Sequence, residues 1–253
     1  MTLLELQKIT GGYDASRDIL DGVSLRLGKG ESVGIIGLNG SGKSTLGKAA
    51  MNMLPRRTGR VLLDGVDVTA YSTSRLAHAG VGFLMQGAPV FDQLTVAENL
   101  RLAAGGEAAL KDAIQRLTPI FPRLIQQRSV GFPACASNSS STDKNVHAPL
   151  YRRRADKLSG GERHQLALCL ALVKPAKLLI LDEPSAGLDP AAADVLYKIL
   201  ETVRNETHVS ILLIEQNVKL AFNFCRRVLV MRQGRLEDAK LETNFSSLSE
   251  NRK

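Results

Sequence analysis

The residue types that could do chemistry are densest in the segment 37–45, which reads GLNGSGKST. It fits the pattern G-x-x-x-x-G-K-[ST], in which glycines let the backbone curl so that successive N–H groups point at a phosphate. A helix that starts at the end of such a loop adds positive potential. We therefore predict a phosphate-binding loop, with Lys43 reaching the β- and γ-phosphates of a nucleotide and the Ser44 hydroxyl binding Mg²⁺. The residues that we expect to surround the phosphates are Gly37, Leu38, Asn39, Gly40, Ser41, Gly42, Lys43, Ser44 and Thr45.

A phosphate site of this kind also needs a carboxylate for the metal and a group that activates water. The segment 177–184, KLLILDEP, supplies both. An apolar strand there would deliver Asp182 and Glu183 at its carboxyl end, where open α/β sheets bind ligands. We expect Asp182 to hold the Mg²⁺ shell and Glu183 to accept a proton from the attacking water. Alone, these letters also fit a strand that ends in an acidic turn.

The elements that must position these residues can be predicted from hydrophobic patterning. The phosphate loop lies between a short β-branched run at 31–37 and a helix-favouring stretch at 46–54. Further apolar runs alternate with helical patterns such as 191–204, which indicates an α/β fold with buried parallel strands. The strand candidates are SVGIIG, GRVLLDG, GVGFLMQ, KLLILDE, SILLIEQ and RRVLVMRQGRL.

The charge of the chain is concentrated in one segment. Of the net charge of +8 over 253 residues, +5 lies between Arg123 and Lys157, where seven Lys or Arg face two Asp. With 4% aromatic residues and no Trp, few side chains could stack on bases, so nucleic-acid binding is not favoured. The composition of the Ser-rich basic stretch 129–154 predicts a loop or disordered insertion. It could lie near anionic lipid or a membrane partner, and the alternative is a solvated loop without a role.

Membrane spans, secretion and cysteine chemistry are not indicated. No run of about 18 apolar residues occurs, and the N-terminus lacks the pattern of a signal peptide. The three cysteines are an odd count at spacings that favour neither a disulfide framework nor a zinc site. We expect a cytoplasmic protein.

Two further motifs indicate a family. LSGGE at 158–162 precedes an apolar helix pattern and then LLILDEPSAGLD at 178–189. With the phosphate loop, these motifs stand in the order typical of the ATP-binding cassette (ABC) ATPases, which the chain resembles over nearly all of residues 3 to 240. The resemblance implies an α/β fold, a P-loop NTPase core with a mostly parallel sheet, plus antiparallel β and helical subdomains. The division that we expect within this single domain is a core lobe at about 1–85 and 158–240, a helical subdomain at about 86–157 that carries the insertion 129–154, and a tail at 241–253.

The resemblance also implies ATP and Mg²⁺ as ligands and a head-to-tail dimer of cassettes. The LSGGE segment would present Ser159, Gly160, Gly161 and Glu162 at a helix N-terminus, where hydroxyl, N–H groups and helix dipole face the γ-phosphate held by the other subunit. Alone, LSGGE is also a plausible helix cap.

Three single residues match family positions. Gln86 matches the glutamine that links the metal to the membrane partner, and Tyr13 matches the aromatic residue that stacks on adenine. Asp189 matches the acidic end of the dimer-facing loop. The alternatives are a polar residue that ends a strand for Gln86 and an ordinary loop tyrosine for Tyr13.

Gln216, in LLIEQN, stands where most cassettes carry a histidine that touches the γ-phosphate. An amide can donate a hydrogen bond there but cannot carry charge; the alternative is a surface residue at a strand end. With VFDQLTVAENL and FPRL, this glutamine makes the chain most similar to the ATPases of branched-chain amino acid importers and their urea and amide relatives. Leu124 and Leu158 are 34 residues apart, a longer spacing than in that group, so 129–154 looks inserted.

The implied function is ATP hydrolysis, with Lys43, Glu183 and Gln216 as catalytic residues and Ser44, Gln86 and Asp182 at the metal. It would drive import of branched-chain amino acids or a related small polar solute, from the cytoplasmic face of the membrane. The implied partners are integral-membrane permease subunits, a second cassette subunit of the same or another kind and, indirectly, a solute-binding protein. The alternatives are a soluble cassette ATPase that acts on ribosomes or nucleic acid, and a nucleotide-binding regulator without turnover, against which Glu183 argues.

Overall fold

The computed structural model describes residues 1–14, 17–125 and 150–238. These residues form two compact units, which we describe separately. Of the described residues, the first unit comprises 1–87, 175–186 and those from 200 onwards. The second comprises 88–174 and 187–199.

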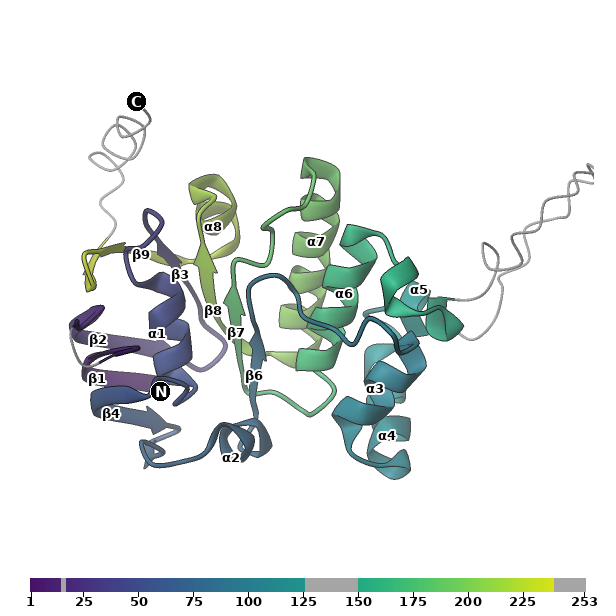
Figure 1. The fold of residues 1–253 in the computed structure, drawn as a ribbon, viewed down its shortest axis with the longest axis horizontal. Helices are drawn as coiled ribbons and strands as arrows, with labels where there is room; N and C mark the ends of the chain where they lie inside the picture. Colours follow the sequence, from purple (N-terminus) through teal and green to yellow (C-terminus); the bar gives the residue numbers. More distant parts are fainter. Residues whose placement is uncertain (15–16, 126–149, 239–253) are drawn as a thin grey trace, which may run out of the picture. The chain divides into compact units, whose positions relative to one another are not determined.

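The first unit contains a six-stranded sheet in the order β10-β9-β3-β8-β7-β6. Its neighbouring strands are parallel except for the antiparallel pair β9–β10 (Figure 1). Every residue of β3, β7 and β8 is buried, as expected of central parallel strands. The strands are β3 (Ser32–Ile36), β6 (Val81–Leu84), β7 (Leu178–Asp182), β8 (Ser210–Glu215), β9 (Arg227–Arg232) and β10 (Arg235–Asp238). The predicted α/β fold with parallel strands is thus confirmed.

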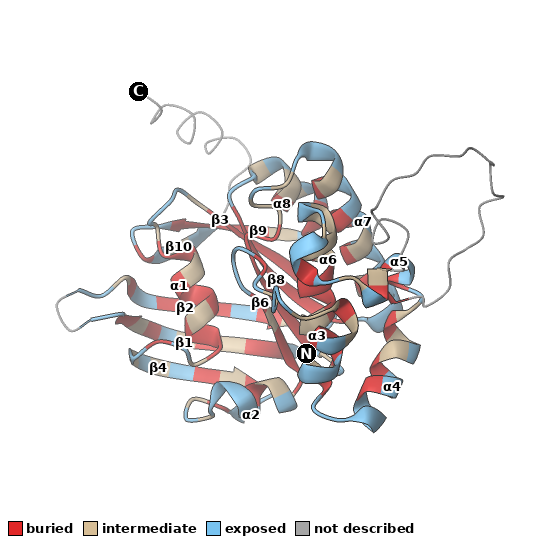
Figure 2. Ribbon diagram, turned by 45° about the vertical axis from the view of Figure 1, so that its right-hand side comes forward, coloured by how far each residue is buried: buried red, intermediate tan, exposed pale blue. Residues whose placement is uncertain are grey.

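A four-stranded antiparallel sheet, in the order β2-β1-β4-β5, completes the β-structure of this unit. Figure 2 shows buried and exposed positions alternating along it; in β1, Leu4 and Leu6 are buried whereas Glu5 and Gln7 are not. The strands are β1 (Thr2–Gly12), β2 (Leu20–Gly28), β4 (Arg56–Leu63) and β5 (Val66–Asp67).

Helix α1 (Lys43–Ala50) packs between the two sheets, and one hydrophobic core joins all three. Its close approach to the parallel sheet explains Gly47, since a Cβ there would lie 2.8 Å from Cδ1 of Ile214. The unit also contains α2 (Thr73–His78) and α8 (Val218–Phe224).

The second unit is helical. Two of its helices begin with capping boxes, in which Thr95 pairs with Glu98 and Ser159 with Glu162. The buried amide of Asn99 donates to three carbonyls of residues 91–95 and accepts from the N–H of Phe91, which fixes the loop before α3. The elements are α3 (Val96–Ala104), α4 (Glu107–Leu117), α5 (Pro122–Ile125), the 3₁₀ turns Leu150–Arg152 and Ala155–Lys157, α6 (Gly160–Ala171) and the first part of α7 (Pro190–Thr207), which ends in the first unit.

The structure differs from the expected division in three places. Residues 158–174 and 187–199 belong to the second unit rather than to the core lobe. In the first of these segments, α6 packs on α3 and α5. The expected insertion 129–154 falls largely outside the described residues, as does the tail 241–253, but its end is not a loop without structure. Tyr151 is buried within a 3₁₀ turn, and Arg154 forms a β-bridge with Thr95.

Among the described helices, none has the length and apolar character needed to cross a membrane.

Candidate active site

The predicted phosphate-binding loop connects β3 to α1 in the first unit. Gly37, Gly40 and Gly42 have φ angles of +155°, +76° and +106°, in the region that favours glycine. A Cβ at Gly37 would lie closer than 3.0 Å to the carbonyl oxygen of Met231. Gly42 caps α1, so the first turn of the helix and its unpaired N–H groups lie at the loop. The loop therefore has the backbone path and the helix end that a bound anion requires.

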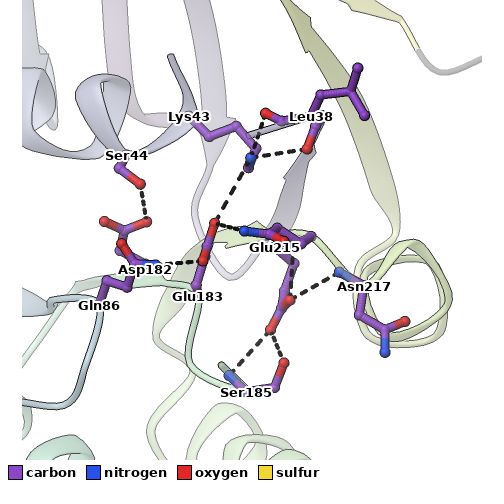
Figure 3. Close-up of polar contacts among 11 residues, drawn as sticks. Leu38, Lys43, Ser44, Gln86, Asp182, Glu183, Ser185, Glu215 and Asn217 are labelled. Carbon is purple, nitrogen blue, oxygen red and sulfur yellow. Dashed lines mark hydrogen bonds and ion pairs between the residues drawn. The ribbon is translucent and has the colours of Figure 1, made fainter. Parts of the chain in front are cut away.

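Lys43 is buried against this loop. Its Nζ donates hydrogen bonds to the carbonyl oxygens of Gly37 (2.9 Å) and Leu38 (3.0 Å) and lies 3.9 Å from Oε1 of Glu183 (Figure 3). Burial lowers the pKa of Lys43, and the nearby carboxylates, that of Glu183 first, oppose this shift. The ammonium is thus placed to exchange loop carbonyls for phosphate oxygens.

Ser44 and Asp182 form the part of the site that could hold a metal ion. Ser44 Oγ donates a 2.8 Å hydrogen bond to Oδ1 of Asp182, the last residue of β7. Burial raises the pKa of Asp182, the Ser44 hydrogen bond opposes this rise and the charge of Glu183 adds to it. A hydroxyl beside a buried carboxylate suits Mg²⁺, which usually takes one or two carboxylates and completes its octahedron with phosphate and water. In the part of the chain that the structure describes, no group of three or more His, Cys, Asp or Glu could hold a metal.

Glu183 lies beyond the end of β7 in a strained conformation, with φ at +50°. Two amides orient its carboxylate: Gln86 Nε2 donates to Oε2 at 2.8 Å and Gln216 Nε2 donates to Oε1 at 2.9 Å. The backbone N–H of Glu183 donates to the carbonyl of Ile214 in β8 at 2.9 Å. Both amides donate, so the carboxylate of Glu183 is the hydrogen-bond acceptor of this cluster.

Glu215 is a site residue that the sequence analysis missed. It ends β8, is 2% exposed and accepts hydrogen bonds from Ser185 on one oxygen and from the N–H groups of Gln216 and Asn217 on the other. The signal in the sequence was an acidic residue at the end of the otherwise apolar run SILLIE. A carboxylate buried in this way needs such partners, because its desolvation is costly.

Six of the predicted site residues therefore meet in the first unit, where the ends of β3, β7 and β8 adjoin. They are Lys43, Ser44, Gln86, Asp182, Glu183 and Gln216. Tyr13 belongs to the same unit; it is 46% exposed, and Nζ of Lys48 lies 5.2 Å from the centre of its ring.

Five predicted residues belong to the second unit: Ser159, Gly160, Gly161, Glu162 and Asp189. Ser159 and Gly160 are exposed at the N-terminus of α6, where Ser159 Oγ accepts from the N–H of Glu162 at 3.3 Å. Among the described residues, no heavy atom outside its own stretch of the helix lies within 4 Å of a Cβ built at Gly160, so Gly160 faces open space. Asp189 is exposed and accepts from the N–H of Ala192 at 3.0 Å. Both segments are ordered by their own caps and leave polar groups at the surface.

Comparison with known proteins gives consistent matches. A family model described as ABC transporter matches residues 20–186. The chain is 32% identical over 236 residues to a probable branched-chain amino acid transport ATP-binding protein LivF of Archaeoglobus fulgidus, covering 92% of this chain and 90% of the relative. It is 32% identical over 238 residues to the high-affinity branched-chain amino acid transport ATP-binding protein BraG of Pseudomonas aeruginosa, covering 92% and 91%.

The chain is also similar to a third relative and to a solved structure. The lipopolysaccharide export system ATP-binding protein LptB of Haemophilus influenzae is 29% identical over 236 residues, covering 93% of this chain and 89% of the relative. The crystal structure of an ATP-binding cassette of an ABC transporter in its ADP conformation superposes with a TM-score of 0.74 at 26% identity, covering 94% of this chain and 90% of that one.

Proposed function

The chain belongs to the ABC transporter family and is an ATP-binding cassette ATPase, and from this membership we propose that it powers a membrane importer for branched-chain amino acids or a related small polar solute. The observation that supports the catalytic part of this proposal is the environment of Glu183, whose buried carboxylate accepts hydrogen bonds from two amides beside the phosphate-binding loop. The two relatives named for branched-chain amino acid transport support the substrate class.

Each site residue of the first unit has a separate role in the proposed hydrolysis. The glycine loop binds the phosphates through its N–H groups, and Lys43 neutralises charge on the β- and γ-phosphates. Ser44 and Asp182, with Gln86, would hold Mg²⁺, which supplies charge neutralisation for the phosphates when bound. Glu183 orients the attacking water and takes its proton, while Gln216 donates a hydrogen bond toward the γ-phosphate.

The second unit would complete the site of another cassette. We propose a head-to-tail dimer, of two identical or two different chains, in which Ser159, Gly160, Gly161 and Glu162 of one subunit face the γ-phosphate on the other. The open N-terminus of α6 supports this, since such helix ends attract anions. Tyr13 would stack on the adenine and Asp189 would lie at the dimer-facing loop.

Transport requires a membrane partner, so we propose permease subunits that hold the chain at the cytoplasmic face of the membrane, with a solute-binding protein acting indirectly. The similarity to LptB, a protein named for lipopolysaccharide export, leaves a different cargo as the second candidate. Co-purification with the permease, followed by a test of which solute stimulates ATP hydrolysis, decides between the cargoes. Stimulation by a branched-chain amino acid supports the proposal, and a response only to lipid would overturn the substrate class.

Glu183→Gln tests the catalytic assignment. The variant keeps the shape of the side chain but cannot accept a proton, so we expect unchanged ATP affinity and a turnover reduced by at least about a hundredfold. Because ATP is then not cleaved, the variant should elute from a size-exclusion column as a dimer in the presence of ATP.

Glu206→Gln, at an exposed position near the end of α7, is the matched control and should behave as the native chain. If Glu183→Gln turned over ATP at a near-native rate, Glu183 would not be the general base.

A further inference from the structure

We propose that Glu215 is a positioning residue for ATP hydrolysis: it fixes the backbone that carries Gln216 and ties it to the turn after Glu183, so that the Gln216 amide stays on the carboxylate of the base. The inference rests on the proposed function, because it adds a residue to the same site.

The carboxylate of Glu215 joins two segments that are far apart in the sequence. Oε1 accepts from the hydroxyl of Ser185 at 2.6 Å and from its N–H at 3.3 Å, in the turn that comes after Glu183. Oε2 accepts from the N–H groups of Gln216 at 3.0 Å and Asn217 at 3.2 Å (Figure 3). One side chain therefore fixes both the turn after β7 and the turn after β8.

These contacts close a ring through the base. From Glu215 the ring runs along the backbone of Gln216 to its amide, which donates to Glu183 at 2.9 Å, and then along the chain to Ser185 and back to Glu215. A shift of either turn must break at least one bond of the ring, because each bond is close to its normal length. The position of the Gln216 amide on Glu183 thus depends on the hydrogen bonds that Glu215 accepts from Ser185, Gln216 and Asn217.

The burial of Glu215 argues against a role in stability alone. A carboxylate that is 2% exposed loses its hydration, and it lies in the same cluster as the carboxylates of Asp182 and Glu183. A well-packed apolar residue at the end of β8 would avoid this penalty. An apolar residue could not accept the hydrogen bonds that the carboxylate of Glu215 accepts from both turns at once.

The test is a double-mutant cycle of Glu215→Gln and Gln216→Ala. A glutamine at 215 has the size of glutamate, but one of its oxygens becomes an NH₂ group that faces the donors of Ser185 or those of Gln216 and Asn217. We expect each single variant to lower kcat about tenfold, the factor for losing one hydrogen bond of about 1.4 kcal/mol from the transition state, with little change in KM for ATP. If Glu215 acts through Gln216, the double variant should be no slower than Gln216→Ala alone.

Two further variants separate positioning from folding. Ser210→Ala removes a buried 2.8 Å hydrogen bond to the N–H of Gly30 at the opposite end of β8, so it should lower the unfolding temperature without changing kcat. Ser185→Ala removes only the hydroxyl contact with Glu215 and keeps the proposal testable if Glu215→Gln does not fold. Its loss of kcat should be smaller and should also vanish in the Gln216→Ala background.

The outcomes are distinct. Multiplied effects, with the double variant about a hundredfold slower than the native chain, would overturn the proposal, as would a native kcat in Glu215→Gln. ATP binding, measured with a fluorescent nucleotide, should remain native in all these variants. If instead Glu183→Gln retained turnover, the proposed function of the site would fail, whatever the result of the cycle.

Discussion

Replacing Gly37 with alanine tests whether the phosphate-binding loop can form only around a glycine. With φ at +155°, Gly37 occupies a backbone region that costs a residue with a side chain about 1–3 kcal/mol. The new Cβ would also lie 2.9 Å from Oγ of Ser41 and closer than 3.0 Å to the carbonyl oxygen of Met231. Overpacking of this kind typically costs a further 1–3 kcal/mol or so. We expect the free energy of unfolding to fall by roughly 2–6 kcal/mol, a large part of the roughly 5–15 kcal/mol that stabilises a typical domain.

Gly40→Ala is the matched control for this prediction. Gly40 lies in the same loop with φ at +76°, but in the described part of the chain no heavy atom beyond its chain neighbours lies within 4 Å of a Cβ built there. We therefore expect Gly40→Ala to lower the free energy of unfolding only through the left-handed backbone conformation, by about 1–2 kcal/mol. Urea unfolding of both variants without nucleotide measures the difference. Equal losses of stability would refute the reasoning, because they would mean that Met231 and Ser41 yield to the new Cβ without cost.

Two further predictions concern pH. Asp182→Asn should raise the unfolding temperature of the nucleotide- and metal-free protein at neutral pH, because burial raises the pKa of Asp182 above its ordinary 3.8 and the native chain must bury the ionised form. At pH values between 3.8 and the raised pKa, the folded state holds one more proton than the unfolded state. The stability of the native chain therefore falls as pH rises through this window, whereas that of the variant does not. Thermal melts from about pH 3.5 to 7.5 should show the difference in melting temperature grow with pH, and equal melting temperatures at neutral pH would contradict the prediction. Gln216→His should add an inflection to the ATPase rate between roughly pH 6 and 7.5, since histidine titrates there and glutamine does not. An unchanged pH profile, measured with the permease present, would place residue 216 outside the site.

The sequence predicted the strands of the parallel sheet well, for reasons that the structure makes plain. The buried runs that became β3, β7 and β8 are continuous in apolar residues because both of their faces are covered. The conformation of the loop 37–42 could be predicted because it depends on glycines with positive φ angles, which a short motif specifies locally.

Other features depend on contacts that no local pattern encodes. β1 and β2 were not among the strand candidates, although Leu4 and Leu6 alternate with polar residues as an antiparallel strand requires. Glu215 was missed because a glutamate at a strand end usually faces water, and only the placement of β8 between β3 and β7 buries it. The burial of Tyr151 likewise depends on the packing of the helical unit rather than on the polar letters around it.

The register of the parallel sheet explains why residues so distant in sequence form one site. Ile36 pairs with Glu215, and Asp182 pairs with Ile214, so β3, β7 and β8 end at the same level. The phosphate loop, Glu183 and Gln216 come directly after these three strand ends and must then meet at one edge of the sheet. Because side chains alternate along a strand, a slip of one residue in β8 would turn the Glu215 side chain to the other face of the sheet and open the hydrogen-bonded ring around Glu183. The burial of the apolar runs therefore fixes the register, and the register brings the carboxylates of the proposed site together.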